Sequence, residues 1–171
     1  MHILIDGYNL IRQSVRLRRF ERQSLEAGRN ALIAFLSEYQ KCKDHKITVV
    51  FDGWLSGPAR EERDYVSGIH ILYSERGVKA DDVIKRISAH ADEEIVVVSS
   101  DREIASYAAR KGRAVLSSAE FESIAENASP QEPLMNKDED DDDADRPLRK
   151  KGAAYKLSRS QRRAQNSIRK L

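Results

Sequence analysis

Short apolar runs rich in β-branched residues alternate with longer segments of helical periodicity through most of this chain. Each run is bounded by polar or turn-forming residues. The runs are ILI at 3–5, ITVVF at 47–51, IHILY at 69–73, IVVVS at 95–99 and AVL at 114–116. Alternation of this kind is typical of a parallel sheet covered by helices. We therefore predict an α/β fold with a central, mainly parallel sheet of five strands.

The intervening segments are expected to be helices. The longest covers about 21–43, where Leu32, Phe35, Leu36 and Tyr39 recur at helical intervals. The others are predicted at 80–91, 101–111 and 119–127. Their ends carry local signals: capping boxes at Ser100 with Glu103 and at Ser117 with Glu120, and a C-cap at Gly112.

One connection is longer than the usual loop of a compact domain. Between the second and third runs, residues 52–68 contain glycines, a proline and a dense cluster of charges. We predict a long, partly mobile loop there, and loops of this length more often serve a function than not.

Charge divides the chain into a balanced body and a two-part tail. Residues 137–145 hold seven acids and one lysine, whereas residues 146–171 hold ten bases and no acid. Blocks of like charge rarely bury enough apolar surface to fold. We predict one folded domain at 1–128 and a largely disordered acidic, then basic, tail at 129–171. The basic part would suit contact with RNA or the ribosome through counterion release, or it would simply be a solvated tail.

The composition also limits where the protein acts. No apolar stretch approaches the roughly 20 residues of a membrane span, and the start of the chain does not resemble a secretion signal. The single cysteine, Cys42, cannot form an internal disulfide, which favours a reducing compartment. A cytoplasmic protein without a membrane partner is the prediction, and the oligomeric state stays open.

Acidic residues follow the predicted strands at the points where those strands end. In an open parallel sheet, ligands bind outside the carboxyl ends of the strands. These acids are Asp6, Asp52 and Asp101, together with Asp81 and Asp82, which open the helix behind the third strand. All five are therefore expected on one edge of the sheet.

Clustered carboxylates repel one another unless a cation neutralises them, so a divalent metal is the expected partner. Oxygen ligands without histidine or thiolate favour Mg²⁺ or Mn²⁺, and such an ion can activate water for attack on phosphorus. Each acid also has an ordinary explanation. Asp81, Asp82 and Asp101 could serve the helix dipole, and Asp52 could be a turn residue, so its place in the metal site is tentative.

Four motifs in the same order resemble the NYN-domain proteins of the YacP type, in the PIN-like nuclease superfamily. They are IDGYNLI at 5–11, FDG at 51–53, Tyr73 to Gly77 followed by ADDVI at 80–84, and VVSSDREIASYA at 97–108. The resemblance covers about residues 1–125 and leaves the tail uninterpreted. It implies a three-layer α/β/α PIN-like (Rossmann-like) domain and Mg²⁺-dependent cleavage of RNA. It also implies metal-binding roles for Asp6, the Asp81/Asp82 pair and Asp101, with Asn9 as a polar residue beside the first aspartate.

Basic and aromatic residues near the expected site are candidates for contact with RNA. Arginine recognises phosphate through paired donors, and aromatic rings stack on unpaired bases. Beyond the first motif the candidates are Arg12, Arg16, Arg18 and Arg19. In the long loop they are Trp54, Arg60 and Arg63, with Tyr65 as a further aromatic, and Ser100 and Arg102 flank Asp101.

The sequence and the resemblance thus predict a metal-dependent ribonuclease, an endoribonuclease by analogy with the family, acting on mRNA or at the ribosome. The alternative is a non-catalytic RNA-binding or adaptor protein on the same fold. A receiver domain would need an acidic pair after the first strand, and an aspartyl-phosphate phosphatase would need aspartate where Tyr8 stands. Dinucleotide and P-loop sites would need a glycine-rich loop that is missing after that strand.

Overall fold

A computed structural model describes residues 1–53, 58–128 and 159–171 of the chain. Its strands are β1 (His2–Asp6), β2 (Lys46–Phe51), β3 (Glu62–Val66), β4 (Ile69–Tyr73), β5 (Ile95–Val98) and β6 (Ala114–Leu116). Its helices are α1 (Gly7–Gln13), α2 (Leu17–Glu21), α3 (Leu25–Cys42), α4 (Ala80–His90), α5 (Arg102–Arg110), α6 (Ser118–Ala128) and α7 (Arg159–Ile168).

The strands form one six-stranded sheet in the order β3-β4-β2-β1-β5-β6. All neighbouring pairs are parallel except β3 and β4, which are antiparallel. From the central β1 the chain moves outward first to β2 on one side and later to β5 on the other, so strand order reverses at β1. That reversal opens a crevice at the carboxyl end of β1, where Asp6 lies.

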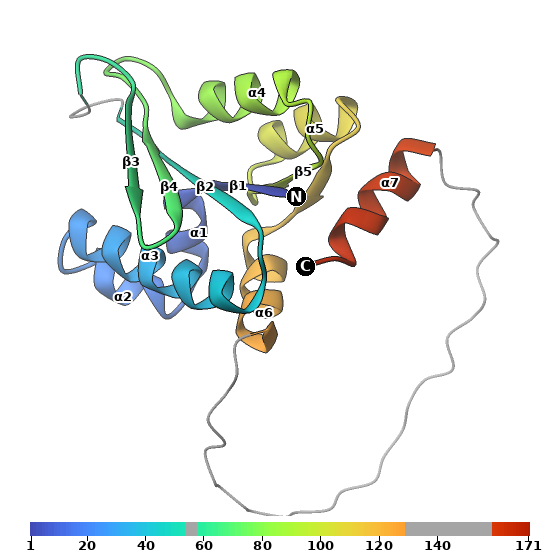
Figure 1. Cartoon of the computed structure of the whole chain (residues 1–171). Coiled ribbons are helices and arrows are strands. Elements are labelled where there is room, and N and C mark those ends of the chain that lie inside the picture. Colours follow the sequence, from blue (N-terminus) through green and yellow to red (C-terminus); the bar gives the residue numbers. More distant parts are fainter. Residues whose placement is uncertain (54–57, 129–158) are drawn as a thin grey trace, which may run out of the picture.

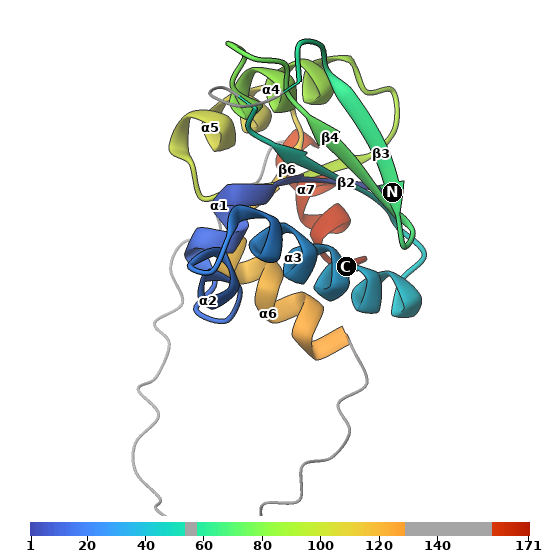
Figure 2. The ribbon, with the colours of Figure 1, turned by 90° about the vertical axis from the view of Figure 1, so that its left-hand side faces the viewer.

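Helices cover both faces of the sheet and make three layers (Figures 1 and 2). On one face, Leu4 and Val97 pack against Val83, Ile84 and other apolar residues of α4 and α5. On the opposite face, apolar residues of the same strands pack against α1, α3 and α6. The central strands are apolar on both sides because both of their faces are buried, as parallel sheets require.

The mainly parallel α/β architecture is confirmed, but the expected count of five strands is wrong. The sixth strand, β3, lies inside the predicted long loop, and it joins β4 through a two-residue turn at Ser67 and Gly68, both with positive φ. A turn of this kind matches the twist of a hairpin. Periodicity could not reveal β3 because all five of its residues are exposed at the sheet edge.

Two short helices also lie where no helix was expected, since α1 and α2 occupy most of residues 7–21. The later helix ends are close to those predicted. Ser117 and Glu120 form the expected capping box, with the Glu120 N–H donating to Ser117 Oγ. At the start of α5 the cap is Asp101 and not Ser100.

The tail departs from the expectation in part, because residues 159–168 form α7. Ala164, Ile168 and Leu171 pack against the core, and Lys170 and Ser167 both donate to Glu94. The acidic run at 137–145 lies outside the described residues. None of the helices in the described ranges has the length and apolar composition that a membrane span requires.

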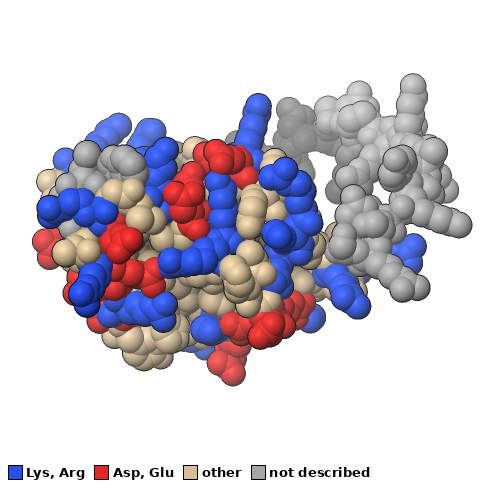
Figure 3. All heavy atoms as spheres, turned by 90° about the horizontal axis from the view of Figure 1, so that it is seen from above, with Lys and Arg blue, Asp and Glu red and all other residues tan. Residues whose placement is uncertain are grey.

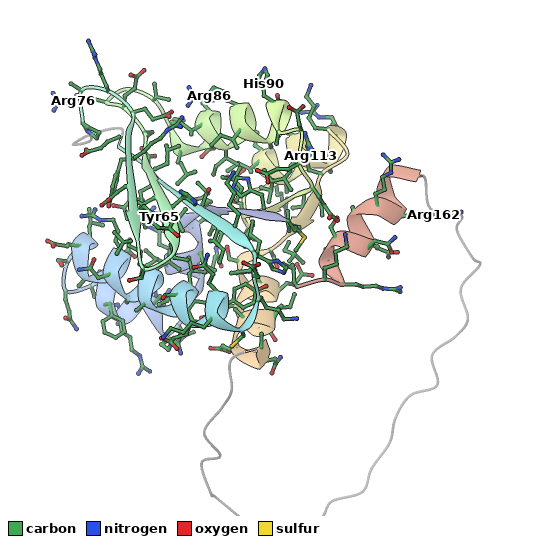
Figure 4. All side chains as sticks on the ribbon, viewed as in Figure 1. Tyr65, Arg76, Arg86, His90, Arg113 and Arg162 are labelled. Atoms are coloured by element: carbon green, nitrogen blue, oxygen red, sulfur yellow. The ribbon has the colours of Figure 1, made fainter. Side chains whose placement is uncertain are left out.

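Arg113 shows how the helix ends are secured on this scaffold. Its guanidinium donates to the backbone carbonyls of Ser88, Ala91 and Glu93 at the end of α4 and in the connection that follows it. Figure 4 labels this side chain between α5 and α7. Carbonyls that the helix leaves unpaired are thereby satisfied.

Candidate active site

A cavity of about 840 Å³ opens at the carboxyl ends of the central strands. Side chains from both helical layers line it, because α1 and α3 lie on one side of the sheet and α4 and α5 on the other (Figure 2). Four aspartates line this cavity, namely Asp6, Asp52, Asp81 and Asp101. The predicted gathering of acids at one edge therefore holds for these four residues.

Asp6 is the most buried of these acids, with 8% of its surface exposed. It ends β1 and caps α1, since its Oδ1 accepts the N–H of Asn9 at 3.1 Å. Burial raises the pKa of Asp6 from 3.8 to about 6, and the nearby charges of Asp81 and Asp101 add to this rise. Hydrogen bonds from Asn9 and Ser99 act in the opposite direction. A carboxylate held in this way is destabilised until a cation or a proton arrives.

Gly7 explains how the helix can approach the sheet so closely beside Asp6. A Cβ atom at this position would lie 2.5 Å from Phe51 Cε1 and 2.9 Å from Val49 Cγ1. Only glycine fits there without displacing β2 side chains. The Asp-Gly pair therefore places a capping carboxylate directly at the end of a strand while α1 packs on the sheet.

The neighbours Asp81 and Asp82 have different surroundings in the first turn of α4. Asp81 is half-buried and lines the cavity, whereas Asp82 is exposed and does not. Burial raises the pKa of Asp81, and the charge of Asp101 contributes to the rise. The sequence left the choice between the two residues open, and the geometry favours Asp81 as the one that faces a ligand.

A buried hydroxyl links two of the acids. Ser99, which is 2% exposed, donates from Oγ to Asp6 Oδ2 at 3.3 Å and accepts the N–H of Asp101 at 3.1 Å. Asp101 uses Oδ1 to cap α5, accepting from Glu103 and Ile104. Ser99 was not among the candidates from the sequence, although its place directly after an apolar strand and two residues before Asp101 was a usable signal.

Asn9 joins three elements. Its Oδ1 accepts the N–H of Ser100 at 2.9 Å and the hydroxyl of Ser118 at 2.8 Å, and the N–H of Ser118 donates to Ser100 Oγ at 3.1 Å. These bonds tie α1 to the β5–α5 connection and to the start of α6. The described contacts of Ser100 are therefore structural, and Asn9 borders the cavity while holding its walls together.

The donor set fits a hard divalent cation that retains part of its water. In the described ranges, no three His, Cys, Asp or Glu side chains are arranged to bind a metal together directly. Mg²⁺, however, commonly keeps several waters and uses only one or two carboxylates. The ligands available at Asp6, Asp81 and Asp101 are oxygens. The charges of Asp81 and Asp101 both raise the pKa of Asp6, and the charge of Asp101 raises that of Asp81, so these carboxyls lie within electrostatic reach of one another.

The cavity also has a basic and aromatic wall on the side of α1 and α3. Of the predicted RNA contacts, Arg12 lines it, paired with Glu21 at 3.2 Å and lying over the ring of Tyr8. Arg29, Tyr8 and Tyr73 line it as well, and Lys79, the N-cap residue of α4, lines the cavity from the other side of the sheet. Arg29 and Tyr73 were not candidates from the sequence, because there Arg29 resembles any other residue of a helix and Tyr73 any other residue of a strand.

The other predicted contacts do not line this cavity. Arg16 lies over the ring of Phe35, Arg18 and Arg19 are exposed on α2, and Arg63 pairs with Glu61 on β3. Arg60 and Arg102 are exposed outside the lining of the cavity, and Trp54 lies outside the described residues. Arg16, Arg18 and Arg19, which lie at the start of α2 and on it, are thus outside the cavity lining, and their contact with RNA stays a prediction.

Comparison with known proteins identifies the family. A family model described as the YacP-like NYN domain matches residues 3–170. The match extends beyond the end near residue 125 that the sequence motifs suggested, and it includes α7. Most of the tail therefore belongs to the matched region, although the sequence motifs left it uninterpreted.

A curated relative and two crystal structures agree with this match. The uncharacterized protein YacP of Bacillus subtilis (strain 168) is 28% identical over 86 residues, which are 50% of this chain and 50% of that protein. The aligned region thus spans about half the length of the curated relative. Two crystal structures of Rae1 (YacP) from Bacillus subtilis, one of them of a point mutant, superpose with a TM-score of 0.61 at 24% identity. They cover 75% of this chain and 76% and 75% of their own chains, and they support the fold.

Proposed function

Because the chain belongs to the YacP-like NYN domain family, we propose that it is a metal-dependent ribonuclease that hydrolyses phosphodiester bonds within RNA. The NYN domain is part of the PIN-like group of nuclease folds. The observation that carries the proposal is the convergence of the buried Asp6 with Asp81 and Asp101 in one open cavity. The raised pKa of Asp6 is a cost to folding that a structural role does not require.

The proposed metal ligands are Asp6, Asp81 and Asp101, with Asp52 at the cavity margin. When bound, a Mg²⁺ or Mn²⁺ ion supplies a water of lowered pKa and neutralises charge on the phosphate. Asp6 contributes a fixed carboxylate, since both of its oxygens are oriented by hydrogen bonds from Asn9 and Ser99. Asn9 acts as a positioning residue, because it holds the β5–α5 connection and α6 against α1.

The wall opposite the acids would bind the substrate. Arg12 lines this wall with a largely exposed side chain, so its guanidinium can contact a polyanion that enters the cavity, although it also pairs with Glu21. The exposed bases of α7 and the residues after it, Arg162, Arg163 and Arg169, suit a second, sequence-independent contact with RNA or the ribosome. Arg162 points outward from the molecule in Figure 4.

A non-catalytic RNA-binding or adaptor protein is the second candidate. It is favoured by the lack, in the described ranges, of three acidic, histidine or cysteine ligands preassembled around one point. On this alternative the protein would bind RNA without a metal-dependent product.

Cleavage of a panel of RNA oligonucleotides, with Mg²⁺ and with EDTA, separates the two candidates. We expect Asp6→Asn to lower the cleavage rate by about a hundredfold or more, since metal-assisted catalysis is worth several kcal/mol. RNA binding by the same variant should remain. Cleavage unchanged by Asp6→Asn would contradict the nuclease proposal, and binding without any product from the unmodified protein would favour the adaptor.

A second arm of this assay addresses the tail. The full chain carrying Arg162→Gln, Arg163→Gln and Arg169→Gln, which keeps the packing of α7 on the core, is compared with the unmodified chain at two salt concentrations. Retained cleavage of a short oligonucleotide with weaker, less salt-dependent binding would assign the tail to recruitment and the cavity to chemistry.

A further inference from the structure

Arg29 of α3 is a half-buried cation in the wall of the cavity, and no ion pair with an acid is found for it in the described ranges. Burying a charge is costly unless the charge is paired, so the arrangement calls for an explanation. Within those ranges its hydrogen bond to protein runs from Nη1 to the hydroxyl oxygen of Tyr8, at 2.9 Å. Arginine has five N–H donors, so most of its capacity remains for a ligand.

Several other arginines of the molecule differ in this respect. Arg12 pairs with Glu21, and Arg63 and Arg86 both pair with Glu61. Lys85 of α4 likewise pairs with Glu103 of α5. On the face seen in Figure 3, basic and acidic side chains lie side by side. Among the described residues, Arg29 therefore stands out as a partly desolvated positive charge that shares a cavity with carboxylates without pairing to one.

Aromatic rings hold the guanidinium of Arg29 in place. Its Cζ lies 5.8 Å from the ring centroid of Tyr73, within reach of a cation–π contact. Tyr8 and Tyr73 are in turn fixed by Phe51, with ring centroids 5.2 Å and 5.7 Å away. Because these rings are packed against β2, the Arg29 fork is oriented before any ligand binds.

The location of Arg29 suggests what it binds. It lies on α3, in the layer on one side of the sheet, whereas Asp81 lies on α4, in the layer on the other side (Figure 1). Both side chains line the same cavity. An anionic group bound to Arg29 would therefore lie in the same cavity as a group bound at the acids. Two phosphates of one RNA strand could occupy the two places.

We propose that Arg29, oriented by Tyr8 and Tyr73, binds a phosphodiester group of the RNA strand next to the one that is cut. The inference rests on the proposed ribonuclease function. Phosphate is the favoured ligand because the planar guanidinium matches its oxygens and because a polyanion offers a second phosphate at a fixed distance from the first. Arg29 is accordingly a substrate-binding residue outside the acidic motifs.

Equilibrium binding of a short single-stranded RNA at several salt concentrations tests this site. The full chain carrying Asp6→Asn is used so that the RNA is not consumed. We expect Arg29→Gln to weaken binding about tenfold and to reduce the slope of log K against log salt by about 0.7, the value for one phosphate contact on a single strand. Arg29→Lys keeps the charge, so it should retain the slope and lose part of the affinity.

Two further variants complete the design. Arg110→Gln removes an exposed charge from the last turn of α5, away from the cavity lining, and should change neither affinity nor slope appreciably. Tyr8→Phe removes only the hydroxyl that orients Arg29, so it should weaken binding with the slope intact. If Arg29→Gln destabilises the fold, Tyr8→Phe and Arg29→Lys still test the proposed site. Both variants should bind RNA less tightly than the parent, with an unchanged slope.

The outcomes separate this inference from the function it rests on. The Arg29 site would be overturned if Arg29→Gln changed neither slope nor affinity, or if neither Tyr8→Phe nor Arg29→Lys changed the affinity. The nuclease function would still stand if Asp6→Asn strongly lowered the cleavage rate. Cleavage that survives Asp6→Asn would instead overturn the nuclease function, whatever Arg29 binds.

Discussion

At the scale of single residues, the account depends on how the fold treats the carboxyl group of Asp6. Its folded pKa, about 6, lies above the ordinary value of 3.8. The folded state therefore binds this proton more tightly than the unfolded chain does. The charge of Asp6 consequently opposes folding above pH 6, and this cost diminishes as the pH falls from about 6 toward about 4.

We expect Asp6→Asn to be more stable than the unmodified protein at a pH of about 7.5 in EDTA. The gain should be on the order of 2–3 kcal/mol, which raises the melting temperature by roughly 5 °C or more. At a pH of about 5 the difference should fall to roughly half. Thermal unfolding of both proteins across this pH range measures it.

Added Mg²⁺ provides the control for the stability experiment. The ion should raise the melting temperature of the unmodified protein and leave that of Asp6→Asn nearly unchanged. An Asp6→Asn variant that is less stable than the unmodified protein at the higher pH would mean that the carboxylate serves the fold.

Strand-end acids were the part of the site that the sequence could predict. Asp6, Asp52 and Asp101 follow apolar strands, so their common edge comes from topology alone. The basic wall could not be predicted in the same way. Arg29 reaches the cavity only through the packing of α3 on the sheet, whereas Arg18 and Arg19 are exposed on α2 and do not line the cavity.

At the scale of elements, the close approach of α1 to β2 determines where Asp6 lies. Gly7→Ala introduces a Cβ 2.5 Å from the Phe51 ring, so we expect a loss of about 1–3 kcal/mol from overpacking. A helical Gly→Ala change would otherwise stabilise by up to about 1 kcal/mol. Chemical denaturation measures the sign directly.

Phe51→Leu serves as the matched partner of Gly7→Ala, because it removes the closest contacting atom. In a double-mutant cycle the loss caused by Gly7→Ala should be smaller in the Phe51→Leu background. A Gly7→Ala variant as stable as the parent, or more so, would show that the approach of α1 is not constrained as described.

Elements differed in how well the sequence predicted them. The buried strands are continuous apolar runs and the long α3 has clear helical periodicity, and both were found close to their predicted positions. The edge strand β3 has no apolar face, and its pairing is set by the Ser67–Gly68 turn and by β4. Short helices such as α1 depend on their caps and on tertiary packing more than on propensity.

At the scale of the whole molecule, residues far apart in sequence complete the structure around the sheet. The tail returns in α7, after which Lys170 pairs with Glu94 and Leu171 joins the core. Composition alone could not predict this contact, because α7 contributes few apolar residues and its partner Glu94 lies far earlier in the chain. Its exposed arginines preserve the basic surface that the sequence associated with RNA.

The central claim concerns the cavity as a whole: its acids carry out RNA cleavage because they face one site across two layers of the fold. Asp81 and Asp82 provide a direct comparison, since they are adjacent, carry the same charge and differ in whether they line the cavity. The deciding measurement is the single-turnover rate of RNA cleavage in Mg²⁺ by Asp81→Asn and by Asp82→Asn. The account predicts a loss of about a hundredfold or more for Asp81→Asn and less than about tenfold for Asp82→Asn, whereas equal rates for the two variants would contradict it.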